Sequence, residues 1–260
     1  MKSEVLFPLL MALVQLLALV RAGRLLRGTS IFMSVVFFIF AYACSLLSSL
    51  YWIAYDILRP DTRMPFAANE IGEWALFLLL AASLQQAQPR YRPYLWESVC
   101  SVLFMLANTI LWIIWSGEWL QDILTGLSLG WLTCVCTQSL KHSGAVSVPE
   151  WIGLGCISIL TVSAQYLELF LPETMKMPLD LLTYILLYAG NVYFILRTIL
   201  SLRRRNCSAK QSIIFAFSAF AWVSVTLYMS GGIFYHITAI LMTVCFGLMV
   251  LPLQKEAKQT

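Results

Sequence analysis

Long apolar stretches separated by short polar connections run the length of the chain. A bilayer core about 30 Å thick needs roughly 20 apolar residues in a helix that rises about 1.5 Å per residue. The pattern therefore predicts nine membrane-spanning helices, over residues 5–21, 30–55, 68–87, 95–115, 119–140, 150–170, 178–200, 211–229 and 232–253. The first stretch is short and contains Pro8, so its pattern is the least regular.

The predicted fold class is an all-α polytopic membrane helix bundle. After the first span, the chain is expected to form four helical hairpins, over residues 30–87, 95–140, 150–200 and 211–253. Hydrophobic residues make up 60% of the chain and charged residues 12%, whereas soluble domains carry about 25% charged residues. We therefore expect residues 1–260 to form a single integral membrane domain in contact with the lipid bilayer.

Lysine and arginine are distributed unevenly between the alternate connections. One set of connections holds 13 of the 17 basic residues, and the other holds Lys2, Arg59, Arg63 and Lys176. Because cytoplasmic loops are enriched in basic residues, the N-terminus is predicted to lie outside and the C-terminus in the cytoplasm. The net charge of +4 comes from basic residues concentrated in these loops. It therefore indicates a multi-pass protein of the cell membrane and no nucleic-acid partner.

Acidic and aromatic residues gather at the predicted outer ends of the helices. Glu70 with Glu73, and Glu118 with Asp122, have spacings that place each pair on one helix face. Such pairs could line an outward-facing mouth that attracts cations or amines. The candidate ligand-binding residues are Asp56, Glu70, Glu73, Trp74, Glu118, Trp119, Asp122 and His236.

A structural interpretation of the same acids competes with this one. Glu70, Glu73, Glu118 and Asp122 all lie in the opening turns of predicted helices, where carboxylates favour the helix macrodipole by about 0.3–1 kcal/mol each. Asn69, Ser116 and Pro178 resemble cap or first-turn residues of those helices. The aromatic residues, in turn, match the belt expected at a membrane interface.

The middle of the predicted spans contains neutral polar residues but no Asp, Glu, Lys or Arg. Proton- or sodium-coupled pumps usually place a carboxylate near the midplane of the membrane. The sequence therefore argues against energy coupling through a midplane carboxylate relay. Uncoupled movement of a small solute remains compatible with it.

The densest basic cluster, Arg203, Arg204 and Arg205, lies on the predicted cytoplasmic side. It is expected to fix the topology and contact anionic lipid, and docking of a cytoplasmic protein partner is a second interpretation. The chain has two histidines, and Cys134 and Cys136 fall on opposite faces of a helix. Neither a metal site nor a cofactor is expected from these residues.

Residues 126–130 match the G-x-S-x-G nucleophile pattern and, equally, the G-x-x-x-G pattern of close helix packing. The nucleophile pattern requires a strand–turn–helix elbow, whereas this segment lies in an apolar helix. A Ser128–His236 pair would be needed for an embedded hydrolase.

Three functions are compatible with these features. The first is a small-solute transporter or permease with an acidic and aromatic outer mouth. The second is a membrane sensor or regulatory subunit that signals to a cytoplasmic partner, and the third is an embedded lipid-modifying enzyme. An enzyme is the least supported of the three, because no convincing set of acid, base and nucleophile is present.

Overall fold

The computed structural model describes residues 3–26, 31–59, 68–88, 95–204 and 207–257. Within these ranges the chain is helical, with short turns between the helices. The α-helices are α1 (Ser3–Gly23), α2 (Phe32–Leu58), α3 (Ala68–Ala87), α4 (Leu95–Ser116), α5 (Trp119–Ser143), α6 (Val148–Glu168), α7 (Glu173–Arg203), α8 (Ala209–Met229) and α9 (Gly232–Ala257), and a 3-10 helix, η1 (Arg24–Leu26), extends α1. The predicted all-α fold is confirmed.

Each predicted span coincides with one α-helix, and α3 has the predicted boundaries. The largest difference is in α7, which begins at Glu173 and not at residue 178. Pro178 was interpreted as a first-turn residue, but it lies inside the helix. A proline is tolerated close to the start of a helix, so it is only an approximate marker of the boundary.

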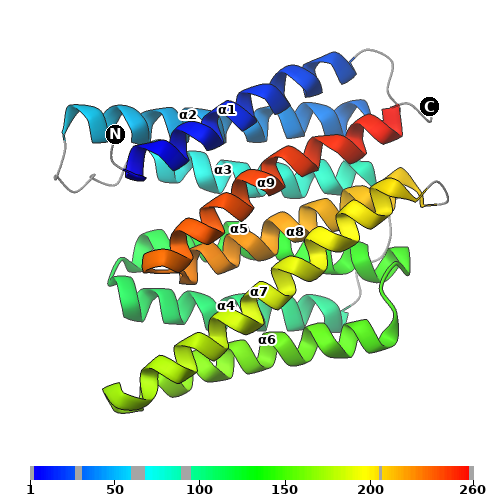
Figure 1. The fold of residues 1–260 in the computed structure, drawn as a ribbon. Coiled ribbons are helices and arrows are strands. Elements are labelled where there is room, and N and C mark those ends of the chain that lie inside the picture. Colours follow the sequence, from blue (N-terminus) through cyan, green and yellow to red (C-terminus); the bar gives the residue numbers. More distant parts are fainter. Residues whose placement is uncertain (1–2, 27–30, 60–67, 89–94, 205–206, 258–260) are drawn as a thin grey trace.

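The helices lie side by side along one common direction, so that the turns gather at two ends of the bundle (Figure 1). α1 begins and α9 ends at opposite ends, as an odd number of passes requires. α8 lies in the middle of the bundle and packs against α3, α5, α7 and α9. Its side chains are buried on every face, including Ile213, Phe217 and Phe220, which is typical of a helix that is apolar all round.

The distribution of polar and apolar side chains is that of a membrane protein. Large apolar side chains cover the outer surface, among them Leu47, which is 67% exposed, and Leu127, which is 66% exposed. Gln15, Asn108 and Asn191 are completely buried. Because lipid cannot form hydrogen bonds, polar side chains turn inward and bond to neighbouring helices.

Among the described helices, seven are long and apolar enough to cross a membrane, namely α1, α2, α4, α5, α7, α8 and α9. α3 and α6 do not reach that level of apolarity, but they run alongside the other seven through the bundle. α3 has 20 residues, which span about 30 Å at 1.5 Å each. Its polar residues lie near its two ends, and Leu80, Ala81 and Leu84 are buried between them.

Polar contacts between helices fix how the bundle packs. Ser34 of α2 and Ser83 of α3 each donate a hydrogen bond to the other's backbone carbonyl, both over 2.8 Å. Gln15 of α1 donates to Ser45 of α2 over 2.8 Å. Such reciprocal bonds in an apolar interior define one relative register of α1, α2 and α3.

Candidate functional site

The start of α3 is held unusually close to α2. A Cβ atom at Gly72 would come within 2.9 Å of the carbonyl oxygen of Cys44, so only glycine permits this approach. One turn earlier, Ser48 of α2 donates a hydrogen bond to the carbonyl of Asn69 over 2.9 Å. These contacts place the neighbouring residue Glu73 on the face of α3 that turns toward α8.

Glu73 accepts a hydrogen bond from the hydroxyl of Tyr228 in α8, with 2.6 Å between Oε2 and Oη. The ring of Trp112 in α4 packs on the ring of Tyr228 with 5.2 Å between the centroids. Trp74 donates from its indole nitrogen to the hydroxyl of Thr125 in α5 over 2.9 Å. A carboxylate is thus held between helices by a phenol and lies beside aromatic rings.

We use the name Glu73 cluster for Glu73 and Trp74 of α3, Trp112 of α4, Asp122 and Thr125 of α5, and Tyr228 of α8. Four helices contribute to it, near the end of the bundle that is predicted to face outward. Trp112 is 3% exposed and its indole nitrogen has no hydrogen-bond partner among the described residues. A buried donor without a partner in an otherwise bonded cluster is a feature that a bound ligand could satisfy.

The acids of α5 have a different local role. The hydroxyl of Ser116 donates to the carboxylate of Asp122 and accepts from the backbone N–H of Glu118 over 2.8 Å. Ser116 ends α4 and its hydroxyl satisfies a backbone N–H in the turn before α5, whereas the N-cap residue of α5 is Glu118, whose side chain makes no capping hydrogen bond. Asp122 is nevertheless only 8% exposed, and its carboxylate lies close enough to Tyr228 to interact with it electrostatically, so it belongs to the cluster.

The structure brings together Glu73, Trp74 and Asp122 of the candidate residues, and it adds Tyr228, Thr125 and Trp112. Trp119 is 61% exposed, on the outer surface of the bundle. Glu70 precedes Glu73 by one turn of α3 and is partly buried, and Glu118 is partly buried at the start of α5. The side chain of Asp56 lies outside the described residues.

His236 of α9 is directed to another part of the bundle. Its ring stacks on Phe7 of α1 with 5.2 Å between the centroids and meets the edge of Tyr235. Ser128, its proposed partner in a hydrolase, donates its hydroxyl to the carbonyl of Thr125 in its own helix over 3.1 Å. These contacts support a packing role for both residues.

Gly126 packs directly against α4. A Cβ atom at Gly126 would lie 2.0 Å from the hydroxyl oxygen of Thr109, and one at Gly130 would meet Met105 at 3.4 Å. This is the close approach of two helices that a G-x-x-x-G pattern predicts.

Two residues of the basic cluster are described. Arg203 ends α7 and Arg204 follows it, and both side chains are exposed. Arg205 lies outside the described residues. The end of α7 is held by Lys255 of α9, whose ammonium group donates to the carbonyls of Ser201, Arg204 and Cys207 at 3.0, 3.2 and 3.0 Å.

A cavity of about 1090 Å³ lies along α4 and α5 and reaches the end of α3. We call it the α4–α5 groove; it is lined by Gln85, Gln86, Gln88, Ser98, Val102, Met105, Leu106, Thr109, Ile123, Gly126, Leu127, Gly130, Trp131, Cys134 and Gln138. Its glutamines lie toward the end of the bundle that is predicted to be cytoplasmic. Its lining includes no residue of the Glu73 cluster, although Gly126 follows Thr125 of that cluster along α5.

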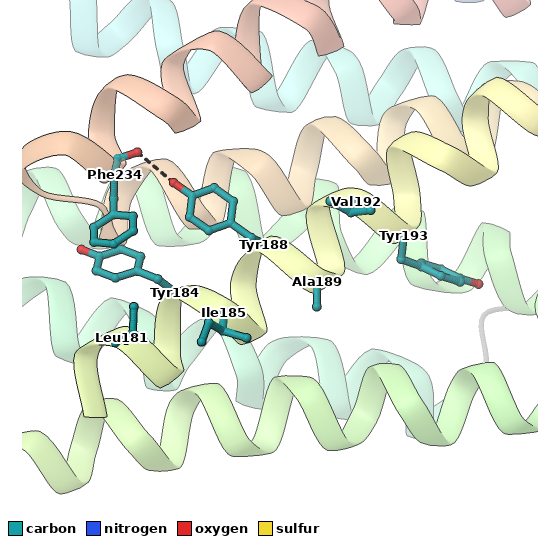
Figure 2. Close-up of a pocket in the computed structure, with 8 residues that line it drawn as sticks. All are labelled: Leu181, Tyr184, Ile185, Tyr188, Ala189, Val192, Tyr193 and Phe234. Atoms are coloured by element: carbon teal, nitrogen blue, oxygen red, sulfur yellow. Dashed lines mark hydrogen bonds between the residues drawn. The ribbon is translucent and has the colours of Figure 1, made fainter. Parts of the chain in front are cut away.

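A second hollow, of about 590 Å³, lies on α7 beside the start of α9 (Figure 2). Tyr184 stacks on Phe234 with 3.9 Å between the centroids, and Tyr188 donates to the carbonyl of Phe234 over 2.9 Å. Tyr184 also accepts from the backbone N–H of Gly231 over 3.1 Å. These tyrosines hold the α8–α9 turn on α7, so their polar groups serve packing.

The fold and its polarity define a multi-pass α-helical membrane protein. No family model, curated protein or solved structure matches the chain. The geometry of the Glu73 cluster and of the α4–α5 groove is therefore what any functional proposal must rest on.

Proposed function

We propose that this protein is a small-solute transporter that binds an amine or another organic cation at the Glu73 cluster. The observation that carries the proposal is the hydrogen bond between Glu73 and Tyr228, formed next to tryptophan rings inside the bundle. A carboxylate attracts a cation by charge, and the faces of aromatic rings attract it through their quadrupole. An uncharged solute would gain neither interaction.

The place of the cluster in the fold supports movement of the solute. Glu73 belongs to the first predicted hairpin, Trp112 and Thr125 to the second, and Tyr228 to the fourth. Membrane transporters commonly bind substrate between units that shift relative to one another. Breaking the Glu73–Tyr228 bond to accept a cation would change the contact between α3 and the central helix α8.

The chemistry also limits the mechanism. The carboxylates of the cluster lie near one end of the bundle, and the predicted spans hold no acidic or basic residue at mid-depth. We therefore propose uncoupled movement of the solute, driven by its own gradient and by the membrane potential.

The test uses purified protein with choline, putrescine and the uncharged carbon isostere of choline. A bound ligand raises the unfolding temperature in proportion to occupancy, so stabilisation by a cation but not by the isostere is expected. Uptake of the stabilising cation into proteoliposomes is then measured. Stabilisation and uptake should both be lost in Glu73→Gln and retained in Glu118→Gln, which changes a partly buried carboxylate at the start of α5.

Equal stabilisation by the isostere, or unchanged binding in Glu73→Gln, would refute the cation site. Binding without uptake would refute transport and favour the sensor interpretation. In that case the exposed Arg203 and Arg204 at the end of α7 become the candidate contact for a cytoplasmic partner.

A further inference from the structure

The α4–α5 groove has a polar end and a long apolar part. Its polar end combines glutamines from the end of α3 with Ser98 of α4 and Gln138 of α5. The rest is lined mainly by apolar residues such as Val102, Leu106 and Trp131. The lining therefore suits an amphipathic ligand, with a polar headgroup at one end and an apolar chain along the rest.

The groove opens to the lipid. Val102 is 56% exposed, Leu106 is 54% exposed and Leu127 is 66% exposed, although all three line the cavity. In a bilayer these surfaces face hydrocarbon, so a ligand can enter sideways from the membrane. A cavity of about 1090 Å³ lies at the upper end of the range for small-molecule sites.

The groove runs along most of the length of α5. From Ile123 to Gln138, α5 rises by 15 steps of about 1.5 Å, or about 22 Å. The hydrocarbon core of a bilayer is about 30 Å thick. With a headgroup among the glutamines near the ends of α3 and α5, an acyl chain can therefore lie along the floor of the groove.

Two glycines shape the α5 side of the groove. Gly126 and Gly130 both line the groove, one turn apart on α5. Gly126 is required for contact with Thr109, but a Cβ atom at Gly130 would meet Met105 only at 3.4 and 3.6 Å. Close packing of α4 and α5 therefore accounts for Gly126, but less well for Gly130.

The described lining of the polar end is uncharged and contains an unused donor. The described lining residues include no Asp, Glu, Lys or Arg, and Lys141, one turn beyond Gln138, is paired with Glu97 over 3.6 Å. The side-chain nitrogen of Gln88 is buried and has no hydrogen-bond partner among the described residues. The side-chain nitrogen of Gln138 donates a hydrogen bond to the hydroxyl of Ser98, which fixes the position of the Gln138 amide at this end of the groove.

From these observations we infer that the α4–α5 groove binds an uncharged glycerolipid, whose hydroxyl-bearing headgroup accepts hydrogen bonds from Gln88 and whose acyl chain lies over Gly130. The glutamines select hydroxyl groups, because neutral amides hydrogen-bond hydroxyls without the cost of burying an unpaired charge. This site is separate from the Glu73 cluster and does not depend on transport.

The test uses full-length protein in nanodiscs with a photoreactive diacylglycerol that carries the diazirine in its acyl chain. Crosslinks are expected on the lining segments of α4 and α5, and unlabelled diacylglycerol should compete where an equal mole fraction of phosphatidylglycerol does not. Gln88→Leu should reduce labelling about tenfold, the effect of losing about 1.4 kcal/mol of binding free energy. Gln121→Leu, on α5 but outside the groove lining, should leave labelling unchanged.

Gly130→Leu provides a second variant, because it adds bulk to the groove lining and its Cβ atom would meet the side chain of Met105 at 3.4 Å, with no backbone atom within 4 Å outside its own helix. It should reduce labelling while the unfolding temperature shows that the protein is folded. Equal competition by phosphatidylglycerol, labelling spread evenly over all lipid-facing helices, or unchanged labelling in both variants would overturn the inference.

Discussion

The hydroxyl of Tyr228 donates a hydrogen bond to the carboxylate of Glu73 over 2.6 Å, and thereby joins α8 to α3 across 155 residues of sequence. Asp122, by comparison, accepts a hydrogen bond from Ser116, the last residue of α4 and six residues away in the sequence. The bond couples the central helix to the only cluster in which the candidate acids and aromatic residues meet among the described residues.

We predict that Tyr228→Phe destabilises the protein more than the double variant Tyr228→Phe with Glu73→Gln. Removing the donor alone leaves a partly buried carboxylate without its partner, which costs about 1–3 kcal/mol. The two residues should therefore show a coupling free energy within about 0.5–3 kcal/mol in a double-mutant cycle. Thermal unfolding in detergent measures it, with Tyr51→Phe as a control, because the ring of Tyr51 stacks on Tyr55 of the same helix. Additive effects of the two changes would contradict the bond.

Gly126→Ala is expected to destabilise the α4–α5 contact strongly. The added methyl group would lie 2.0 Å from the hydroxyl oxygen of Thr109, so α4 must shift, and overpacking of this kind costs about 1–3 kcal/mol. Gly155→Ala is the matched control, because nothing lies within 4 Å of a Cβ atom there. The expected result is a lower unfolding temperature for the first variant and an unchanged or higher one for the second.

Lys255→Met should loosen the end of α7. The variant keeps the long apolar part of the side chain but removes the charge that bonds three carbonyl groups, one in the last turn of α7 and two just after it. Cations at helix C-termini contribute about 0.3–2 kcal/mol. Hydrogen exchange of the amides at the end of α7 should accelerate, whereas Lys210→Met, which changes an exposed lysine, should leave it unchanged.

The predicted orientation can be tested with native Cys207, which lies in the α7–α8 turn. A membrane-impermeant maleimide added to intact cells should leave Cys207 unmodified and modify it after permeabilisation. Gly231→Cys, in the α8–α9 turn at the other end of the bundle, should be modified in intact cells when combined with Cys207→Ser. The reverse pattern would mean that the topology is inverted.

Hydropathy was sufficient to predict the helices, because each apolar run is nearly as long as the bilayer is thick. It could not place the start of α7, since the helix begins five residues before the proline that was used as its marker. The bounds of each helix follow from the local sequence, whereas the helices that it packs against are determined by the tertiary fold.

The acids illustrate that limit. Their spacing correctly put Glu118 and Asp122 near one helix start, and the structure adds that Ser116 connects them. Tyr228 was missed, because it lies in an apolar run and nothing in its neighbourhood marks it. The available signal was indirect: Tyr228 precedes the turn at Ser230 by two residues, which places it at the same predicted depth as Glu73.

The glutamines of the α4–α5 groove were also missed. Gln85, Gln86 and Gln88 end one predicted span and Gln138 ends another, so all four were expected near the same membrane surface. Their convergence depends on α3 and α4 flanking α5, which only tertiary packing determines. Neutral amides at a span end also look like ordinary interfacial residues.

The central position of α8 has a consequence for biogenesis. The ribosome completes seven helices before α8 emerges, so these helices must reside in the membrane without the helix against which α3, α5 and α7 pack. The ring of Phe77 in α3, which packs against Phe220 of α8, then faces lipid or a membrane chaperone until α8 arrives. Quality control of this protein should therefore act late in synthesis, when α8 enters a partly assembled bundle.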